Sequence, residues 1–233
     1  MPRFFVSKEN INEEERVISI LGEDAFHIAR SLRMAVGDEI TVADMQGREH
    51  SCRLTKIRDD ACECEILSTT EGKTESPVEI TLFMGYPKGD KLEVVIQKAV
   101  ELGVNKIVFF ESRYTVSKID QKKAQRLNKI SVEASKQCGR AVIVPVEVAS
   151  IKQVASQLNG YDVALFCYEK AQDVSLSSAA GIIVGSEGGF AEEEAQLFVD
   201  SGATAVTLGK RILRAETAPL YAMAVLCDRL GEN

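Results

Sequence analysis

Apolar and polar positions follow two different rhythms along the chain. Up to residue 70 the apolar residues form short runs with β-type alternation, and glycines at positions 22, 37 and 47 separate several of them. This pattern predicts a small β-barrel. The predicted strands are Arg3–Val6, Val17–Ile20, Glu39–Asp44, His50–Ile57 and Cys62–Leu67.

One stretch with helical spacing, Asp24–Arg33, interrupts these strands. Its apolar residues fall near one helix face, so its histidine and two arginines can point elsewhere. The apolar set is Phe26, Ile28, Ala29 and Leu32, and the polar set is His27, Arg30 and Arg33.

A polar segment over residues 71–77 predicts a linker between this barrel, residues 1–70, and a second domain, residues 78–233. In the second domain, apolar strands alternate with amphipathic helices, which is typical of an α/β domain with a mostly parallel sheet. The predicted strands are Val78–Gly85, Lys106–Phe110, Val142–Val148, Asp162–Cys167, Gly181–Gly185 and Ala205–Leu208. The predicted helices are Lys91–Leu102, Lys122–Gln137, Ile151–Leu158, Glu192–Ser201 and Thr217–Leu230.

Composition narrows the classes of function. The formal net charge of −7 argues against a nucleic-acid partner, but residues 84–140 carry 12 basic and 6 acidic side chains. This local excess fits either a solvated helical face or a contact with phosphates. The chain has no long apolar run and no signal-peptide pattern at its start, so we expect it in the cytoplasm. Its cysteines form no CxxC pair and its two histidines are far apart, so we expect no metal site.

The segment Ile182–Phe190 reads Ile-Ile-Val-Gly-Ser-Glu-Gly-Gly-Phe, a buried strand that runs into a glycine-rich turn. Glycines let a backbone bend sharply and bring its N–H groups close to a ligand. The carboxyl end of a parallel strand is the usual ligand position in open α/β sheets. The spacing matches neither GxGxxG nor GxxxxGK[ST], and the same glycines would also serve a tight turn without a ligand.

A second loop, Leu208–Pro219, reads Leu-Gly-Lys-Arg-Ile-Leu-Arg-Ala-Glu-Thr-Ala-Pro and leads into an apolar helix. Thr217 and Pro219 supply residues that favour a helix start, so the loop is held at both ends. Its basic residues suit an anionic partner, or else they pair with acidic neighbours.

Together, Gly185-Ser-Glu-Gly-Gly189 and Leu208-Gly-x-x-Ile-Leu-Arg-x-Glu-Thr-Ala218 resemble the paired cofactor loops of the SPOUT methyltransferases, whose C-terminal chain forms a trefoil knot. The resemblance narrows to the RsmE family, the uridine N3-methyltransferases of small-subunit ribosomal RNA. His27-Ile-x-x-Ser-Leu-Arg33 with Gly37 looks like that family's PUA-like RNA-binding domain. Four further motifs match in order: Lys88-Gly-Asp-Lys91, Gln97-Lys-x-x-Glu-Leu-Gly103, Ser112-Arg113 and Glu133-Ala-x-x-Gln-Cys-Gly-Arg140.

The resemblance implies that S-adenosylmethionine binds in the knot, largely through backbone groups. One position departs from the family, because Ser186 stands where a proline is usual, which leaves the loop less rigid. The implied cofactor contacts are Phe166, Cys167, Gly185, Ser186, Glu187, Gly188, Gly189, Leu208, Gly209, Ile212, Leu213 and Ala218.

For catalysis, Arg214 is the candidate that stabilises the uracil anion as N3 loses its proton, because a guanidinium offers several directed donors. Glu216 either orients Arg214, acts as the base, or only favours the start of the following helix. No metal is needed.

The resemblance also implies partners. Ribosomal RNA of the small subunit would contact Arg3, Arg30 and Arg33 in the first domain, and Lys88, Lys91, Arg113 and Arg140 in the second. A homodimer would form through the apolar helix Ala218–Leu230, although the same helix could be buried within one subunit. Two alternatives remain open: methylation of a ribose 2′-oxygen or another base, and a non-catalytic ribosomal RNA-binding factor.

Overall fold

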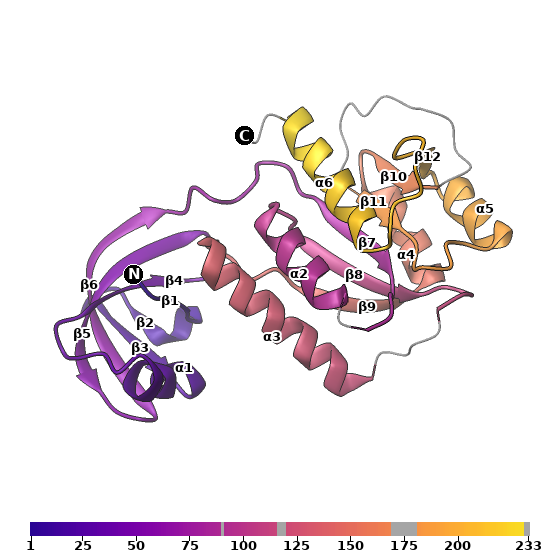
Figure 1. Cartoon of the computed structure of the whole chain (residues 1–233). Helices are drawn as coiled ribbons and strands as arrows, with labels where there is room; N and C mark the ends of the chain where they lie inside the picture. The colour runs from indigo at the N-terminus through magenta and orange to yellow at the C-terminus, as the bar shows by residue number, and fades with distance from the viewer. Residues whose placement is uncertain (90, 116–119, 169–180, 231–233) are drawn as a thin grey trace. The chain divides into compact units, whose positions relative to one another are not determined.

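The computed structural model describes residues 1–89, 91–115, 120–168 and 181–230, and the chain forms two compact units (Figure 1). The first unit combines Met1–Glu75 with Ser135–Ile143, and the second combines Ser76–Ala134 with Val144–Asn233. The boundary predicted from the sequence leaves residues 135–143 in the second domain, whereas the structure groups them with the first unit. The pattern of the predicted helix Lys122–Gln137 gives no sign that its last turn belongs to a different unit.

The N-terminal unit is built on a six-stranded sheet in the order β1-β4-β5-β6-β3-β2. Strand β1 pairs with β4 in parallel, and all the other pairs are antiparallel. Because β1 and β2 stand at the two ends of this order, the sheet is a curled half-barrel and not a closed barrel. The strands are β1 (Arg3–Phe5), β2 (Ile11–Asn12), β3 (Val17–Leu21), β4 (Glu39–Ala43), β5 (Arg48–Ile57) and β6 (Ala61–Glu71), and a short helix η1 (Lys8–Asn10) precedes β2.

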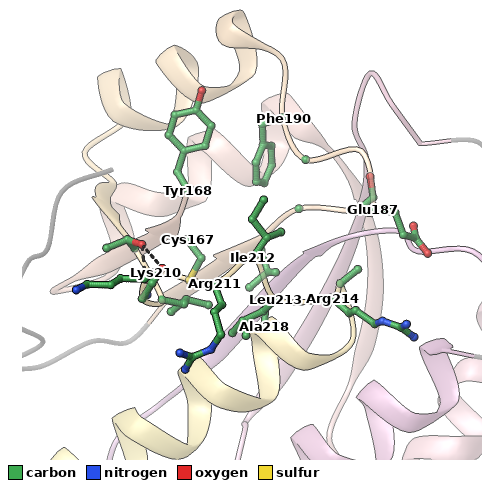
Figure 2. A pocket seen from close by; sticks show the side chains of 18 of the residues that line it. Cys167, Tyr168, Glu187, Phe190, Lys210, Arg211, Ile212, Leu213, Arg214 and Ala218 are labelled. Carbon is green, nitrogen blue, oxygen red and sulfur yellow. Dashed lines mark hydrogen bonds between the residues drawn. The ribbon is translucent and has the colours of Figure 1, made fainter. Parts of the chain in front are cut away.

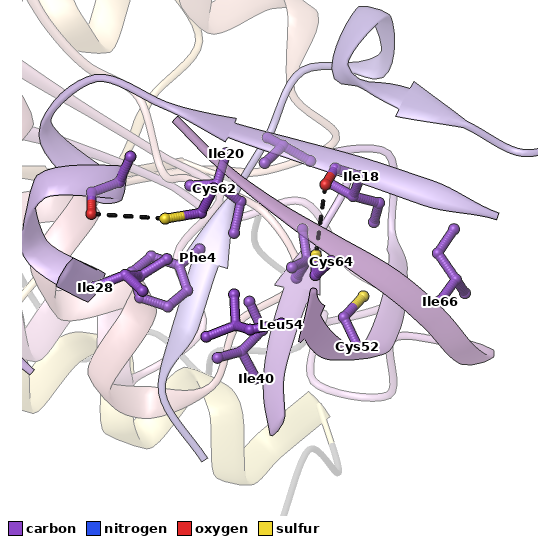
Figure 3. Packing of buried hydrophobic residues seen from close by; sticks show 13 residues of the cluster. Phe4, Ile18, Ile20, Ile28, Ile40, Cys52, Leu54, Cys62, Cys64 and Ile66 are labelled. Atoms are coloured by element: carbon purple, nitrogen blue, oxygen red, sulfur yellow. Dashed lines mark hydrogen bonds between the residues drawn. The ribbon is translucent and has the colours of Figure 1, made fainter. Parts of the chain in front are cut away.

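Alternate residues of these strands point to one side and form the core of the unit (Figure 3). Ile18 and Ile20 of β3 face the thiols of β6, where Cys62 and Cys64 are fully buried. The Cys64 Sγ donates to the Ile18 carbonyl oxygen at 3.6 Å, and the cysteines of this core are free thiols. The period-2 pattern of the sequence therefore predicted five of the six strands and missed the two-residue strand β2.

The helical stretch differs from its prediction in which face is buried. Helix α1 (Glu23–Phe26) continues into a π-helical turn, η2 (His27–Ser31), in which the Leu32 N–H donates to the His27 carbonyl at 2.9 Å. Ala25 and Ile28 are fully buried, whereas the side chains of Phe26 and Leu32 are 53% and 40% exposed. The inward face runs through Ala25 and Ile28, and Met34 after the turn also packs against the core.

The C-terminal unit contains a fully parallel sheet in the order β12-β10-β11-β7-β8-β9. All six strands predicted for this part are present, most of them shorter than predicted. Strands β7 and β11 lie in the interior of the sheet and are buried along their whole length, which explains their continuous apolar runs. The strands are β7 (Thr81–Gly85), β8 (Lys106–Glu111), β9 (Val146–Ser150), β10 (Ala164–Cys167), β11 (Gly181–Val184) and β12 (Thr204–Val206).

The predicted helices are also present in this part of the chain. Helix α4 begins with a capping box, in which Ser150 and Gln153 satisfy each other's backbone N–H groups. Within the described ranges no helix is long and apolar enough to cross a membrane. The helices are α2 (Lys91–Glu101), α3 (Gln121–Cys138), α4 (Ile151–Gln157) with a 3-10 turn η3 (Leu158–Gly160), α5 (Glu192–Asp200) and α6 (Thr217–Leu230).

The strand order decides where loops meet in this unit. Strand β10 lies between β11 and β12, and all three run in the same direction. The segments that follow these strands therefore leave the sheet at the same edge. This edge is the usual place for a ligand in an open α/β sheet.

Candidate functional site

A cavity of about 460 Å³ opens at the carboxyl ends of β10 and β11 (Figure 2). Four segments far apart in the sequence contribute to its lining: Lys91 of α2, the end of β10, the glycine-rich turn after β11, and residues from 207–218 before and at the start of α6. The size is within the range of small-molecule sites. The two loops singled out in the sequence are thus walls of one cavity.

Most of the predicted cofactor residues line this cavity, and two do not. Phe166 and Gly188 lie behind its wall. The lining residues among those predicted are Cys167, Gly185, Ser186, Glu187, Gly189, Leu208, Gly209, Ile212, Leu213 and Ala218.

Phe166 belongs to the core beneath the cavity. Its side chain is fully buried, and its ring centroid lies 4.9 Å from that of Phe190 and 5.2 Å from that of Phe198. Because side chains of a strand alternate, Phe166 points into the core while the next residue, Cys167, faces the cavity. Phe166 supports Phe190, which does line the cavity.

Gly188 is required by packing within the protein. A Cβ atom at this position would lie 2.5 Å from the Cβ atom of Tyr114, closer than real side chains approach. Tyr114 follows β8, so the loop after β8 presses on the glycine-rich turn from behind. Gly188 thus leaves room for Tyr114, and its contact with the cofactor stays a prediction.

Ser186 is almost fully buried, and its hydroxyl takes part in a small polar network. Its Oγ lies 3.4 Å from the Ser112 Oγ, which in turn lies 3.0 Å from the Thr115 Oγ1. The Gly189 N–H donates to the Ser186 carbonyl at 2.9 Å and closes the turn. These bonds restrain the turn at the position where the family usually has a proline.

Lys91, the first residue of α2, lines the cavity and pairs with two carboxylates, of which Glu187 lines the cavity and the predicted catalytic residue Glu216 does not. Its Nζ lies 3.2 Å from Glu187 Oε1 and 3.1 Å from Glu216 Oε2. The neighbouring carboxylates of Glu216 and Glu187 raise the pKa of Lys91. Asp90, which belongs to the same sequence motif, lies outside the described residues.

The two carboxyl groups are held in their ionised form. Burial opposes the charge of Glu187, but backbone N–H groups and the Lys91 ammonium outweigh it and lower its pKa. The backbone N–H of Glu216 lowers the pKa of that carboxyl, and the charges of Lys91 and Arg214 lower it further. A carboxylate stabilised in this way is a weak base, so Glu216 suits the role of orienting its neighbours better than that of a proton acceptor.

Arg214 lines the cavity with an exposed side chain, and its backbone is fixed. Its carbonyl oxygen accepts the N–H groups of Thr217 and Ala218 at 2.9 Å each, at the start of α6. In Figure 2 the guanidinium points to the side of the cavity where Glu187 lies, away from Cys167 and Tyr168.

Several lining residues were not predicted as cofactor contacts. The aromatic side chains of Tyr168 and Phe190 flank the upper part of the cavity in Figure 2, and each directly follows a predicted segment. Burial raises the pKa of the Cys167 thiol to about 12, so this thiol stays protonated near neutral pH. The remaining unpredicted lining residues are Val184, Thr207, Lys210, Arg211 and Ala215.

Two arginines predicted to contact RNA are internal to the N-terminal unit. The Arg140 side chain is 3% exposed and pairs with Glu75, and its carbonyl accepts a hydrogen bond from Arg3. Arg3 also pairs with Glu49 at 3.0 Å. Both side chains are thus engaged within this unit, at 14% and 3% exposure, and their contact with RNA stays a prediction.

The other predicted RNA-contact residues, apart from Lys91, are exposed. Arg30 pairs with Asp59 at 2.5 Å with both side chains half in solvent, and Arg33 has a left-handed backbone with a φ of 51°. In the C-terminal unit the Lys88 N–H donates to Glu187, and the Arg113 N–H donates to Glu194 at 2.6 Å. Lys88 therefore borders the glycine-rich turn, and Arg113 borders the start of α5. Among the described residues, no cluster of three or more His, Cys, Asp or Glu side chains forms a metal site.

Comparison with known proteins assigns both units. Residues 74–227 match the family model of the RNA methyltransferase domain, and residues 20–67 match that of the RNA methyltransferase PUA domain. The chain is 35% identical to the ribosomal RNA small subunit methyltransferase E of Bacillus subtilis (strain 168), with 97% of this chain and 96% of that protein covered. The chain belongs to the family of ribosomal RNA small subunit methyltransferases E. In this family, the C-terminal unit is the SPOUT trefoil-knot domain and the N-terminal unit is the PUA-like domain.

Solved structures of relatives agree with this membership. A ribosomal RNA small subunit methyltransferase E from Neisseria gonorrhoeae bound to S-adenosyl methionine matches with a TM-score of 0.86, 31% identity, and coverage of 98% of this chain and 97% of that chain. A putative methyltransferase from Legionella pneumophila, in complex with its bound cofactor SAM, matches with a TM-score of 0.87, 27% identity, and coverage of 97% and 96%.

Proposed function

We propose that this protein transfers the methyl group of S-adenosylmethionine to N3 of a uridine in small-subunit (16S) ribosomal RNA. The observation that carries the proposal is the cavity in which both sequence loops meet, in a chain of the methyltransferase E family. The choice of uridine N3 rests on the resemblance to that family.

The residues of the cavity fit S-adenosylmethionine. Gly189 and Gly209 have positive φ angles of 65° and 107°, and the space beside each is open, so their backbones can lie against a ligand. The Ile212 side chain is 86% exposed at the cavity, and an adenine ring would cover this apolar surface. Leu208 and Leu213 add apolar walls. When bound, the cofactor supplies an electrophilic methyl group on a sulfonium ion.

The protein's own residues stabilise the charge on the uracil and align the cofactor with it. Arg214 stabilises the negative charge that uracil develops on its two carbonyl oxygens as N3 loses its proton. Glu216, ionised beside Lys91, orients Arg214 by its charge. The backbone of the glycine-rich turn, held by Tyr114 and Ser112, aligns the cofactor with the attacking nitrogen.

Two kinds of partner complete the proposal. Ribosomal RNA contacts the exposed cations Arg30 and Arg33 of the N-terminal unit, and Lys88 and Arg113 of the C-terminal unit. A second copy of the chain packs on α6, where the Tyr221 side chain is 49% exposed. The protein works in the cytoplasm, where ribosomal RNA is available.

The test is a map of methylated nucleosides in ribosomal RNA from cells with and without the gene. The proposal predicts one N3-methyluridine in small-subunit RNA that disappears with the gene. A lost ribose methyl group would favour the 2′-oxygen instead, and an unchanged map would favour a non-catalytic RNA-binding factor.

A further inference from the structure

We propose that Lys91 is a positioning residue that ties the two loops of the cofactor cavity together by pairing with one carboxylate from each. Its Nζ lies 3.2 Å from Glu187, in the turn after β11, and 3.1 Å from Glu216, in the loop before α6. The inference rests on the proposed function, because it concerns how well this cavity holds S-adenosylmethionine.

The two loops need such a link because they come from different connections of the chain. Glu187 is anchored to the segment before α2, since its carboxylate accepts the Lys88 N–H at 3.0 Å. Glu216 directly precedes α6 and has no comparable bond to that segment among the contacts of the described residues. Lys91 therefore links α2 both to the turn after β11, through Glu187, and to the loop before α6, through Glu216.

Partial burial makes these ion pairs stronger than ordinary surface pairs. The side chains of Lys91, Glu187 and Glu216 are 35%, 32% and 24% exposed, so water screens their charges only in part. Without the ammonium group, the two carboxylates would be close neighbours of the same charge. Their repulsion would push the walls of the cavity apart.

This geometry also changes the role expected for Lys91 from the sequence. An RNA phosphate that approached Lys91 would meet two carboxylates that already neutralise the ammonium group. The net charge of the three side chains is negative, which disfavours a phosphate contact. Lys91 is therefore removed from the proposed RNA-binding residues.

The experiment compares Lys91→Met with Lys98→Met on the same helix. Lys98 pairs only locally, with Glu101 at 2.8 Å, so its replacement removes the same charge away from the cavity. Calorimetry at pH 8 measures the affinity for S-adenosylmethionine. We expect a loss on the order of tenfold for Lys91→Met, equivalent to ~1.4 kcal/mol, little change for Lys98→Met, and substantial recovery in Lys91→Arg.

A pH series separates positioning from a general loss of structure. The charged groups around the position are Glu187, Glu216 and Arg214, whose charge also acts on Glu216. In Lys91→Met the two facing carboxylates repel, so one takes up a proton as the pH falls. The defect in cofactor affinity relative to the unmodified protein should therefore shrink between pH 8 and pH 5. The double variant Lys91→Met/Glu216→Gln should recover affinity at pH 8 for the same reason.

The outcomes are distinguishable. Normal cofactor affinity in Lys91→Met, or a loss of RNA affinity alone, would overturn the inference and leave the proposed function intact. A cofactor defect that is the same at every pH and is not relieved by Glu216→Gln would also overturn it. An unmodified protein that binds no S-adenosylmethionine would overturn the proposed function and, with it, this inference.

Discussion

A Cβ atom on Gly188 would lie 2.5 Å from the Cβ atom of Tyr114, so the loop after β8 and the turn after β11 fit together only with a glycine at this position. The contact involves the base of the tyrosine side chain, which a rotation about its bonds cannot move away. The shape of the cofactor turn therefore depends on a residue that does not touch the cavity.

We accordingly expect Gly188→Ala to weaken the binding of S-adenosylmethionine by at least about tenfold, because one of the two loops must shift. Truncating the neighbour in Gly188→Ala/Tyr114→Gly should restore part of the affinity. Gly160→Ala is the matched control, since a Cβ there meets nothing within 4 Å. Calorimetry measures the cofactor affinity of all three variants. Unchanged affinity in Gly188→Ala would show that the turn adapts to the added methyl group.

Arg214→Lys tests the mechanism. Lysine keeps the charge and loses the planar set of donors, so the rate of methyl transfer should fall by roughly two to three orders of magnitude. Cofactor affinity should change little, because the proposal holds the adenosine through backbone groups that the substitution does not touch. Arg53→Lys, at an exposed pair with Glu39, is the control. A variant whose whole defect lies in cofactor binding would assign Arg214 a structural role.

Glu75→Ala tests whether the buried ion pair of Arg140 stabilises the N-terminal unit. The substitution removes the carboxylate that pairs with a guanidinium only 3% exposed, and breaking a buried pair costs ~3–5 kcal/mol. Glu39→Ala breaks the exposed pair with Arg53 and should cost at most ~1 kcal/mol. Urea unfolding followed by circular dichroism measures both free energies. Equal and small losses would contradict the buried role.

His50 gives the N-terminal unit a pH dependence. Burial lowers the pKa of His50, so below the unfolded value of ~6.5 the unfolded chain binds more protons than the folded one. This contribution to stability is therefore complete above that pH and is lost as the pH falls towards 5. The slope of unfolding free energy against pH should be smaller in His50→Gln than in the exposed control His27→Gln. Identical slopes would refute it.

The proposed dimer is tested by Tyr221→Lys on α6. A lysine in an apolar interface would have to lose its water, so the variant should become a 25.5 kDa monomer while the unmodified protein stays a dimer. Val199→Lys on α5 is the control, because that side chain is similarly exposed, at 45%. Light scattering at low micromolar concentration gives the mass. An unmodified protein that is already monomeric would end the proposal.

The sequence predicted the strands and helices well because their patterns are local. Alternation along β3 and the uninterrupted apolar run of β11 each depend on a few consecutive residues. The resemblance to a known family then predicted that the two loops contact one cofactor. Neither the local pattern nor the resemblance could show which residues pair with the charged side chains, because these ion pairs join residues that are far apart in the sequence.

The differences between expectation and structure therefore concentrate on such contacts. Arg140 was placed at an RNA surface because its partner, Glu75, lies 65 residues away in the sequence. Lys91 was placed there as well, although two distant glutamates surround it. The exposure of Phe26 could not be foreseen either, because the chosen helix face depends on which neighbours pack against it.

The most direct test of the central claim is methyl transfer by the purified protein. Isolated small ribosomal subunits from cells that lack the gene are incubated with the protein and S-adenosylmethionine, and the RNA nucleosides are then measured by mass spectrometry. We predict the appearance of N3-methyluridine in small-subunit RNA, and its near absence with Arg214→Lys. A methyl group on ribose or on another base would contradict the account. So would the absence of any methyl transfer to small-subunit RNA by the unmodified protein.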